Sequence, residues 1–156
     1  MMYLLIKYSH LISMVLLFGT GLGSAFYKWM ADQSKDVGHI AITNRHVVLA
    51  DWLFTTPTII IQPLTGFWML HISGLSFTTD WIAISLALYI IAGLCWIPVV
   101  WLQIRMKALA LQASETKTDL PKQYWHYARL WFWLGIPAFL AMMVIVLLMV
   151  FKPIFL

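Results

Sequence analysis

Four long apolar segments constrain the fold of this chain more than any other feature of its sequence. Each holds roughly 20 mostly apolar residues, the length that an α-helix needs to cross a bilayer core about 30 Å thick. A helix satisfies its backbone hydrogen bonds within itself, as hydrocarbon requires. The sequence therefore predicts an all-α integral membrane four-helix bundle, formed by a single transmembrane domain over residues 1–156. We expect its helices over about 3–26, 47–70, 81–103 and 130–151, the last extended to about residue 120.

The composition also favours a membrane environment. Hydrophobic residues make up 62% of the chain and charged residues 10%, which leaves too little polar surface to cover a water-soluble globule. The ten Lys and Arg residues are dispersed around the apolar segments, so nucleic acid is not an expected partner. The single cysteine, Cys95, excludes a disulfide framework within one chain. We expect a multi-pass protein of the bacterial inner membrane, with the lipid bilayer as its main partner.

The distribution of Lys and Arg predicts the orientation in the membrane. Eight of the ten lie between the first and second or between the third and fourth apolar segments: Lys28, Lys35, Arg45, Arg105, Lys107, Lys117, Lys122 and Arg129. The other two are Lys7 and Lys152. Because cytoplasmic loops carry the excess of positive charge, the two longer loops are expected in the cytoplasm and both termini outside. A capping residue followed by Pro121 marks the start of the last helix before it enters the lipid.

Four of the five histidines fall into two layers of this predicted topology. His10 and His71 lie near the outer surface, and His46 and His126 lie near the inner surface. Histidines at the ends of spans are often interfacial anchors that bind nothing. His10 differs because it lies more than one turn inside a span, where a polar ring needs a partner. His10 is therefore the strongest candidate ligand, and His71 is the first candidate to pair with it.

The residues around these histidines suit a haem b at either layer. A membrane-embedded haem b needs one or two imidazole ligands, an apolar slot and cations near its propionates. In the outer layer, Gly21 follows the same stripe as His10 and would let a flat porphyrin approach the backbone, while Lys7 is a candidate propionate partner. In the inner layer, Arg45 and Arg129 adjoin the histidines and are suited to the same role.

Two other interpretations stay open beside haem. His10, Met14, Met69 and His71 would place two imidazoles and two thioethers in the outer layer, a soft ligand set suited to Cu(I). This set indicates a copper-handling or transport protein. In the other interpretation the histidines are structural, the glycines of the first span pack against a helix, and the chain is a cofactor-free partner subunit of a membrane complex.

The second span contains two further polar residues. Asp51 is a candidate proton relay or a buried partner of Arg45 or Arg129, and the ion pair is favoured. Gln62 stands beside Pro63, and its side chain is expected to bond the backbone carbonyl that the proline leaves free.

Three short runs carry a resemblance to a known family. They are Lys7-Tyr8-Ser9-His10-Leu11-Ile12 with the following Gly19, Asp51-Trp52-Leu53-Phe54-Thr55, and Gln62-Pro63-Leu64-Thr65-Gly66. Over nearly its whole length the chain resembles a family of bacterial predicted integral membrane proteins known only as a domain of unknown function. This resemblance implies a membrane fold and no activity.

A more distant resemblance does imply chemistry. The order of landmarks is similar to that of the HemJ-type protoporphyrinogen oxidases and the CopD-like copper-resistance membrane proteins. His10 matches the histidine that is implicated in haem binding in the HemJ type. Pro57 and Gly66 match landmarks of the second span, and Ile136-Pro137 and Lys152-Pro153 match the last span and its exit.

One departure limits what this resemblance implies. HemJ-type proteins carry a His and a Lys soon after the Trp that opens the third span, whereas this chain has Ala83 and Ser85 at those places. Protoporphyrinogen oxidation by that mechanism is therefore doubtful, and no catalytic residue is assigned. Our leading hypothesis is a haem b-binding membrane protein of electron transfer or oxidoreduction, with a quinone or a periplasmic redox partner and with homo-oligomerisation open.

Overall fold

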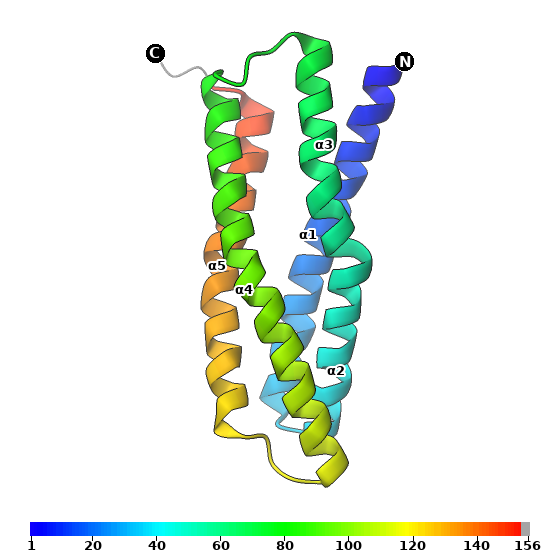
Figure 1. The fold of residues 1–156 in the computed structure, drawn as a ribbon, viewed down its shortest axis with the longest axis vertical. Helices are drawn as coiled ribbons and strands as arrows, with labels where there is room; N and C mark the ends of the chain where they lie inside the picture. Colours follow the sequence, from blue (N-terminus) through cyan, green and yellow to red (C-terminus); the bar gives the residue numbers. More distant parts are fainter. Residues whose placement is uncertain (154–156) are drawn as a thin grey trace. The chain divides into compact units, whose positions relative to one another are not determined.

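The structure, a computed structural model that describes residues 1–153, is all-helical, as the sequence predicts. Its elements are α1 (Met2–Ser34), α2 (Val37–Ala50), the π-helical turn η1 (Asp51–Thr55), α3 (Thr56–Ser73), α4 (Asp80–Thr116) and α5 (Lys122–Phe151) (Figure 1). Because α2, η1 and α3 form one continuous rod, four helices are long and apolar enough to cross a membrane. The described residues contain no β-strand.

The helices extend well beyond the apolar segments, so the two long loops expected from the sequence are largely helical. Between α1 and α2 only Lys35 and Asp36 leave the helical path. Lys35 adopts a left-handed conformation with φ 56° and ends α1. The Asp36 side chain then caps α2 by accepting hydrogen bonds from the backbone N–H groups of Gly38 at 2.9 Å and His39 at 3.3 Å. An apolar segment marks only the part of a helix that lies in lipid. The helix itself can continue into water, because its backbone hydrogen bonds do not depend on apolar side chains.

The chain divides into two compact units, and the first consists of Met1–Gly74 together with Lys107–Leu120. In this unit α1 runs antiparallel to the rod formed by α2, η1 and α3, and it contacts all three elements (Figure 1). The tight turn at Lys35 and Asp36 enforces this hairpin. At the other end of the rod, Gly74 caps α3 with φ 65°, a conformation that glycine adopts without a steric cost.

Prolines shape the rod in the middle of its span. The ring of Pro57 carries no N–H and would crowd the carbonyl of Leu53 in a regular α-helix. Just before it the helix widens into η1, where the Thr56 N–H donates to the carbonyl of Asp51, five residues back. Such π turns are rare in helices and are frequent at functional sites. The rod is therefore irregular in the middle of its span.

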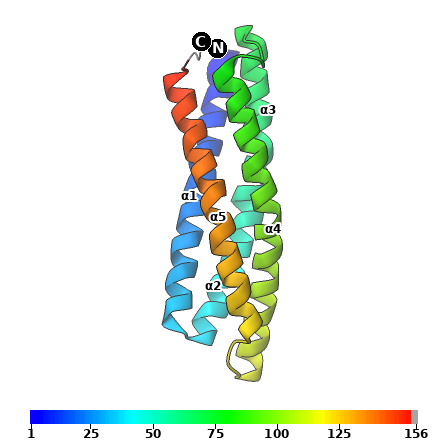
Figure 2. The same ribbon diagram turned by 90° about the vertical axis from the view of Figure 1, so that its left-hand side faces the viewer.

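The second unit consists of Leu75–Met106 and the chain from Pro121 onward. In this unit α4, as far as Met106, lies beside α5 in both views (Figures 1 and 2). Two contacts show that they are antiparallel: Trp101 meets Tyr127 with ring centroids 5.6 Å apart, and the Lys152 ammonium lies 5.9 Å from the ring centre of Trp81. Helix α5 starts at Lys122, close to the position predicted from Pro121.

Each long helix buries a narrow stripe and exposes most of its apolar side chains. In α5, for example, Ala141, Ile145 and Leu148 are buried, whereas Leu140 and Val150 are exposed. A water-soluble protein would bury such side chains, since exposing them to water is costly. A lipid environment removes that cost, so the exposed apolar faces fit the membrane-spanning role of the helices.

We predict that the turn at Lys35 and the segment around Thr118 are cytoplasmic, because the cations cluster on that side. The segment around Ser76 is expected outside. In a Cys95→Ser background, a membrane-impermeant thiol reagent should label Ser76→Cys in intact cells. It should label Lys35→Cys and Thr118→Cys only after permeabilisation. The reverse pattern would contradict the orientation, and labelling of all three in intact cells would contradict four spans.

Candidate functional site

The side chain of His10 lies between α1 and α3 and is bound by a threonine. His10 is 6% exposed, and its Nδ1 atom lies 2.8 Å from the Oγ1 atom of Thr65. The Thr65 hydroxyl itself donates to the carbonyl of Ile61 at 2.6 Å. A hydroxyl has a single proton, so when Thr65 donates it to Ile61, the hydroxyl oxygen is left to accept from a protonated Nδ1 of His10. A neutral ring that is protonated at Nδ1 keeps the lone pair of Nε2. This form of imidazole can ligate a metal through Nε2.

The backbone of His10 is held by the same helix face. The Gln62 amide Nε2 donates to the carbonyl oxygen of His10 at 2.8 Å. One turn further along α1, the hydroxyl of Ser13 donates to the backbone carbonyl of Thr58 at 3.4 Å. The sequence analysis expected Gln62 to bond within its own helix, beside Pro63. Instead the side chain crosses to α1, because that helix packs directly against it.

These residues belong to a stripe that we call the polar stripe: Asp51, Thr55, Thr58, Gln62 and Thr65. Successive members are separated by four, three, four and three residues, which places them on one face of the rod. All but Thr65 are buried. The sequence analysis singled out Asp51 and Gln62 and missed the three threonines. The regular spacing was a usable signal, but threonine is common in membrane helices and does not by itself indicate a site.

Gly66 provides room for the His10 ring. A Cβ atom built on Gly66 would have the Cε1 atom of His10 as its nearest neighbour, at 3.7 Å. Alanine is therefore tolerated at this position, but a larger side chain would occupy the place of the ring. The run Gln62 to Gly66, which carries part of the family resemblance, thus lies against His10. Gln62 contributes an amide, Thr65 a hydroxyl, and Gly66 the absence of a side chain.

At the other end of the polar stripe, Asp51 is buried within the rod. Its Oδ1 atom accepts a hydrogen bond from the Thr55 hydroxyl at 2.8 Å, across the π turn. Arg45, one of its expected partners, is exposed. Arg129, the other, is also exposed and belongs to the second unit.

The first unit also contains a buried ion pair that the sequence did not lead us to expect. The Lys28 ammonium lies 2.6 Å from the Oδ2 atom of Asp32, one turn along α1, and Lys28 is fully buried. We had counted Lys28 as a loop cation. Its four-residue separation from Asp32 was the available signal, since residues four apart share a helix face.

The structure does not bring His71 to His10. His71 is exposed and lies six residues beyond Thr65 on α3. Six residues correspond to a rise of about 9 Å and a rotation of about 240° along an α-helix. His71 therefore points from another face, and one metal ion cannot bridge the two rings in this arrangement.

The other predicted site residues are dispersed. Lys7 is exposed one turn before His10, and Gly21 is exposed with open space where a Cβ would project. Met14 and Met69 are partly buried. His46 is exposed in the first unit and His126 is exposed in the second. Within residues 1–153 no three His, Cys, Asp or Glu side chains gather closely enough to hold a metal ion by themselves.

Comparison with known proteins identifies a family but no activity. Residues 4–153 match the model of a family described as a predicted integral membrane protein (DUF2269). The match runs from the first turns of α1 past the end of α5, so it includes His10, the polar stripe and both units. No curated protein and no solved structure matches the chain.

Replacing Thr65 tests the hydrogen bond to the His10 ring. Thr65→Val keeps the shape of the side chain but leaves the Nδ1–H of a buried ring without its acceptor. We expect a loss of about 1 kcal/mol in the free energy of unfolding in detergent. Thr116→Val is the matched control, because Thr116 also donates to a carbonyl one turn back, at 2.9 Å, but is exposed. Equal effects of the two variants would contradict this role of Thr65.

Substitution of Gly66 tests the gap beside the ring. Gly66→Ala should leave the thermal midpoint nearly unchanged, because its Cβ meets His10 at an ordinary contact distance. Gly66→Leu should lower stability by about 1 to 3 kcal/mol, the usual cost of overpacking. Gly135→Leu is the control, since nothing lies near its Cβ position. A stable Gly66→Leu protein would show that the ring does not need this gap.

Proposed function

The chain belongs to the DUF2269 family of predicted integral membrane proteins, a description that names no activity. We therefore propose a function from the chemistry of the site around His10. We propose that the protein binds haem b in the membrane through His10 and serves electron transfer or oxidoreduction. The observation that carries the proposal is the position of His10: a buried imidazole inside a membrane span, with Nδ1 2.8 Å from the Thr65 hydroxyl oxygen, which makes Nε2 the candidate ligand.

The surroundings of His10 fit the requirements of an axial ligand. Metal-ligating histidines almost always donate their other ring N–H to a second group, which fixes the tautomer and orientation and raises the basicity of the ligand. Thr65 supplies that group, and Gln62 holds the backbone from which the ring projects. Gly66 leaves space beside the ring. Burial of the residue at 6% exposure keeps bulk water from the ligand.

The remaining parts of the proposal concern what the chain supplies around this ligand. A bound haem would supply a one-electron redox centre. Lys7, one turn nearer the N-terminus and exposed, is a candidate partner for a propionate. His71 is not part of this proposal as a second axial ligand, because it is exposed and points from another face of α3. The distant resemblance to HemJ-type proteins supports the choice of His10, and the predicted orientation favours a quinone or a periplasmic protein as redox partner.

An optical spectrum of the purified protein tests the proposal. After haem-replete expression, the wild type should show a Soret band. His10→Ala should abolish it, and Thr65→Val should weaken haem affinity roughly tenfold, because loss of the group that orients a ligand typically has such an effect. His71→Ala and His46→Ala are matched controls and should keep the band, since both rings are exposed.

Several outcomes would contradict haem binding at His10. One is the absence of a Soret band in folded wild-type protein, and another is an unchanged spectrum in His10→Ala. Stoichiometric copper without iron, by elemental analysis, would favour a copper-handling protein that uses His10 with Met14 and Met69. A colourless, metal-free protein that copurifies stoichiometrically with another membrane protein would favour a cofactor-free partner subunit.

A further inference from the structure

A group of cations and aromatic rings lies at one end of the helical hairpin in the second unit. The Arg105 guanidinium carbon lies 5.4 Å from the ring centre of Trp101, and Trp101 meets Tyr127 edge to face at 5.6 Å. His126 contacts the Tyr127 ring at 6.3 Å. The Gln123 amide donates to the Tyr127 hydroxyl oxygen at 2.6 Å, which leaves the hydroxyl proton for another acceptor. We call these five residues, with Lys122 and Arg129, the cationic end.

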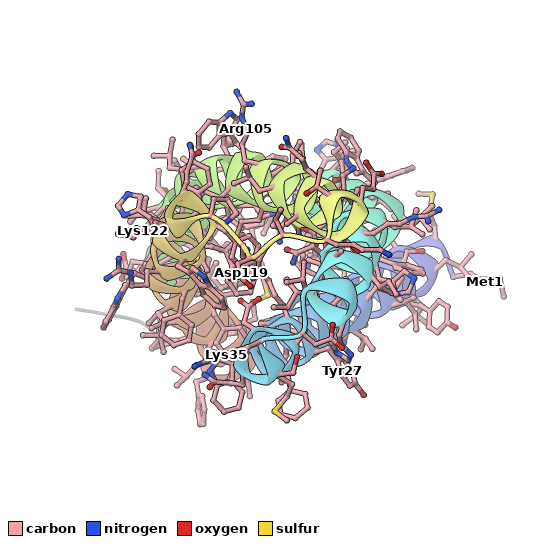
Figure 3. The ribbon with its side chains drawn as sticks, turned by 90° about the horizontal axis from the view of Figure 1, so that it is seen from below. Met1, Tyr27, Lys35, Arg105, Asp119 and Lys122 are labelled. Atoms are coloured by element: carbon pink, nitrogen blue, oxygen red, sulfur yellow. The ribbon has the colours of Figure 1, made fainter. Side chains whose placement is uncertain are left out.

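The register of the hairpin brings these groups to one level. Trp101 of α4 is level with Tyr127 of α5, and the two helices are antiparallel. A residue one turn after Trp101 is therefore level with a residue one turn before Tyr127. Arg105 is therefore level with the turn around Gln123. On α5, Lys122, His126 and Arg129 are separated by four and three residues, so they share one face. All three are exposed. Figure 3 shows the Arg105 side chain projecting away from the α4 ribbon.

The spacing along α4 places the cationic end at a lipid–water interface. Trp81 and Trp101 are 20 residues apart, a rise of about 30 Å, which equals the thickness of the hydrocarbon core. Each of these tryptophans carries a cation over its ring, Lys152 over Trp81 and Arg105 over Trp101. Tryptophan is enriched at the two lipid–water interfaces of a bilayer, so we place the two pairs at opposite surfaces of the membrane.

The two ends of the hairpin differ in charge. The only acidic residue of the second unit, Asp80, lies next to Trp81 and hence at the end that carries Lys152. The cationic end carries Arg105, Lys122 and Arg129 and no acid of this unit. Within residues 1–153 none of these three cations forms an ion pair. Glu115 on α4 and Asp119 before α5 are the nearest acids in the sequence, and neither forms an ion pair with these cations within the described residues.

We propose that the cationic end binds the phosphate of an anionic phospholipid such as phosphatidylglycerol. Arg105 suits the phosphate because a guanidinium donates two parallel hydrogen bonds to it, and the ring of Trp101 holds the guanidinium in place. The free Tyr127 hydroxyl proton supplies a further donor. Exposed apolar side chains one turn deeper, Ile97 on α4 and Leu130 on α5, provide the surface along which acyl chains lie. This combination distinguishes a lipid from a soluble phosphate.

Native mass spectrometry of the full-length protein in detergent tests the site. With equal concentrations of phosphatidylglycerol and phosphatidylcholine, the wild type should retain phosphatidylglycerol preferentially. Arg105→Gln should weaken that retention roughly fivefold, as expected for one cation near an anionic lipid. Arg105→Lys should recover only part of it, because ammonium lacks the bidentate fork. Lys152→Gln is the matched control, a cation over a tryptophan at the opposite end, and should have little effect.

Three results would overturn the proposal. One is equal retention of the two lipids by the wild type, which needs no variant. The second is an equal loss in Lys152→Gln and Arg105→Gln, which would indicate a general charge effect. The third is displacement of the lipid by an equal concentration of glycerol 3-phosphate, which would show that acyl chains contribute nothing. Arg105 is exposed, so its variants should keep the wild-type melting temperature, and Arg129→Gln repeats the test if Arg105→Gln does not fold.

Discussion

The bilayer core offers no water to hydrogen-bond a polar group, and the first unit is built around that constraint. A histidine, a glutamine, an aspartate and several hydroxyls lie within its apolar segments, and each needs a partner inside the protein. Helix α1 and the rod satisfy several of these groups between them. His10 bonds Thr65, and Gln62 bonds the backbone of His10. The polar stripe therefore specifies how the two helices face each other, which apolar side chains in lipid cannot do alone.

The same constraint explains why the rod can tolerate its prolines. Pro57 and Pro63 each remove a backbone donor in a region without water. Near Pro57 the helix widens into a π turn, and the single proton of the Thr58 hydroxyl is shared between the carbonyls of Phe54 and Thr55, both 2.8 Å from its oxygen. The hydroxyls of the polar stripe thus serve the backbone as well as the neighbouring helix. Irregular backbone is kept where protein, and not lipid, satisfies it.

The two units present different chemistry to the membrane. In the first, a polar ring is enclosed within the hydrocarbon region, and its orientation is fixed by a second helix. In the second, arginine, tryptophan and tyrosine meet at one end of the helical hairpin, which we place at the depth of the lipid headgroups. The enclosed imidazole suits a cofactor that must be kept from water, whereas the exposed guanidinium suits a ligand that comes from the bilayer itself. His10 of α1 is oriented by Thr65 of α3, whereas Arg105 lies over Trp101 of its own helix, and the Trp101 ring in turn meets Tyr127 of α5.

The fold class and the four spans can be read from the apolar segments alone, and His10, Asp51 and Gln62 can be recognised as polar residues inside them. These follow from local rules, because apolar length decides what enters lipid and a polar side chain inside lipid is costly. Spacing along one helix would also have revealed the Lys28–Asp32 pair and the threonines of the polar stripe.

The contacts across helices could not be predicted in this way. Depth in the membrane grouped His71 with His10, but direction around the helix axis separates them. Depth fixes one coordinate of a side chain, whereas contact also depends on the rotation and register of each helix. Those are set by packing between segments some 50 residues apart in the sequence, as in the 55-residue separation of His10 and Thr65.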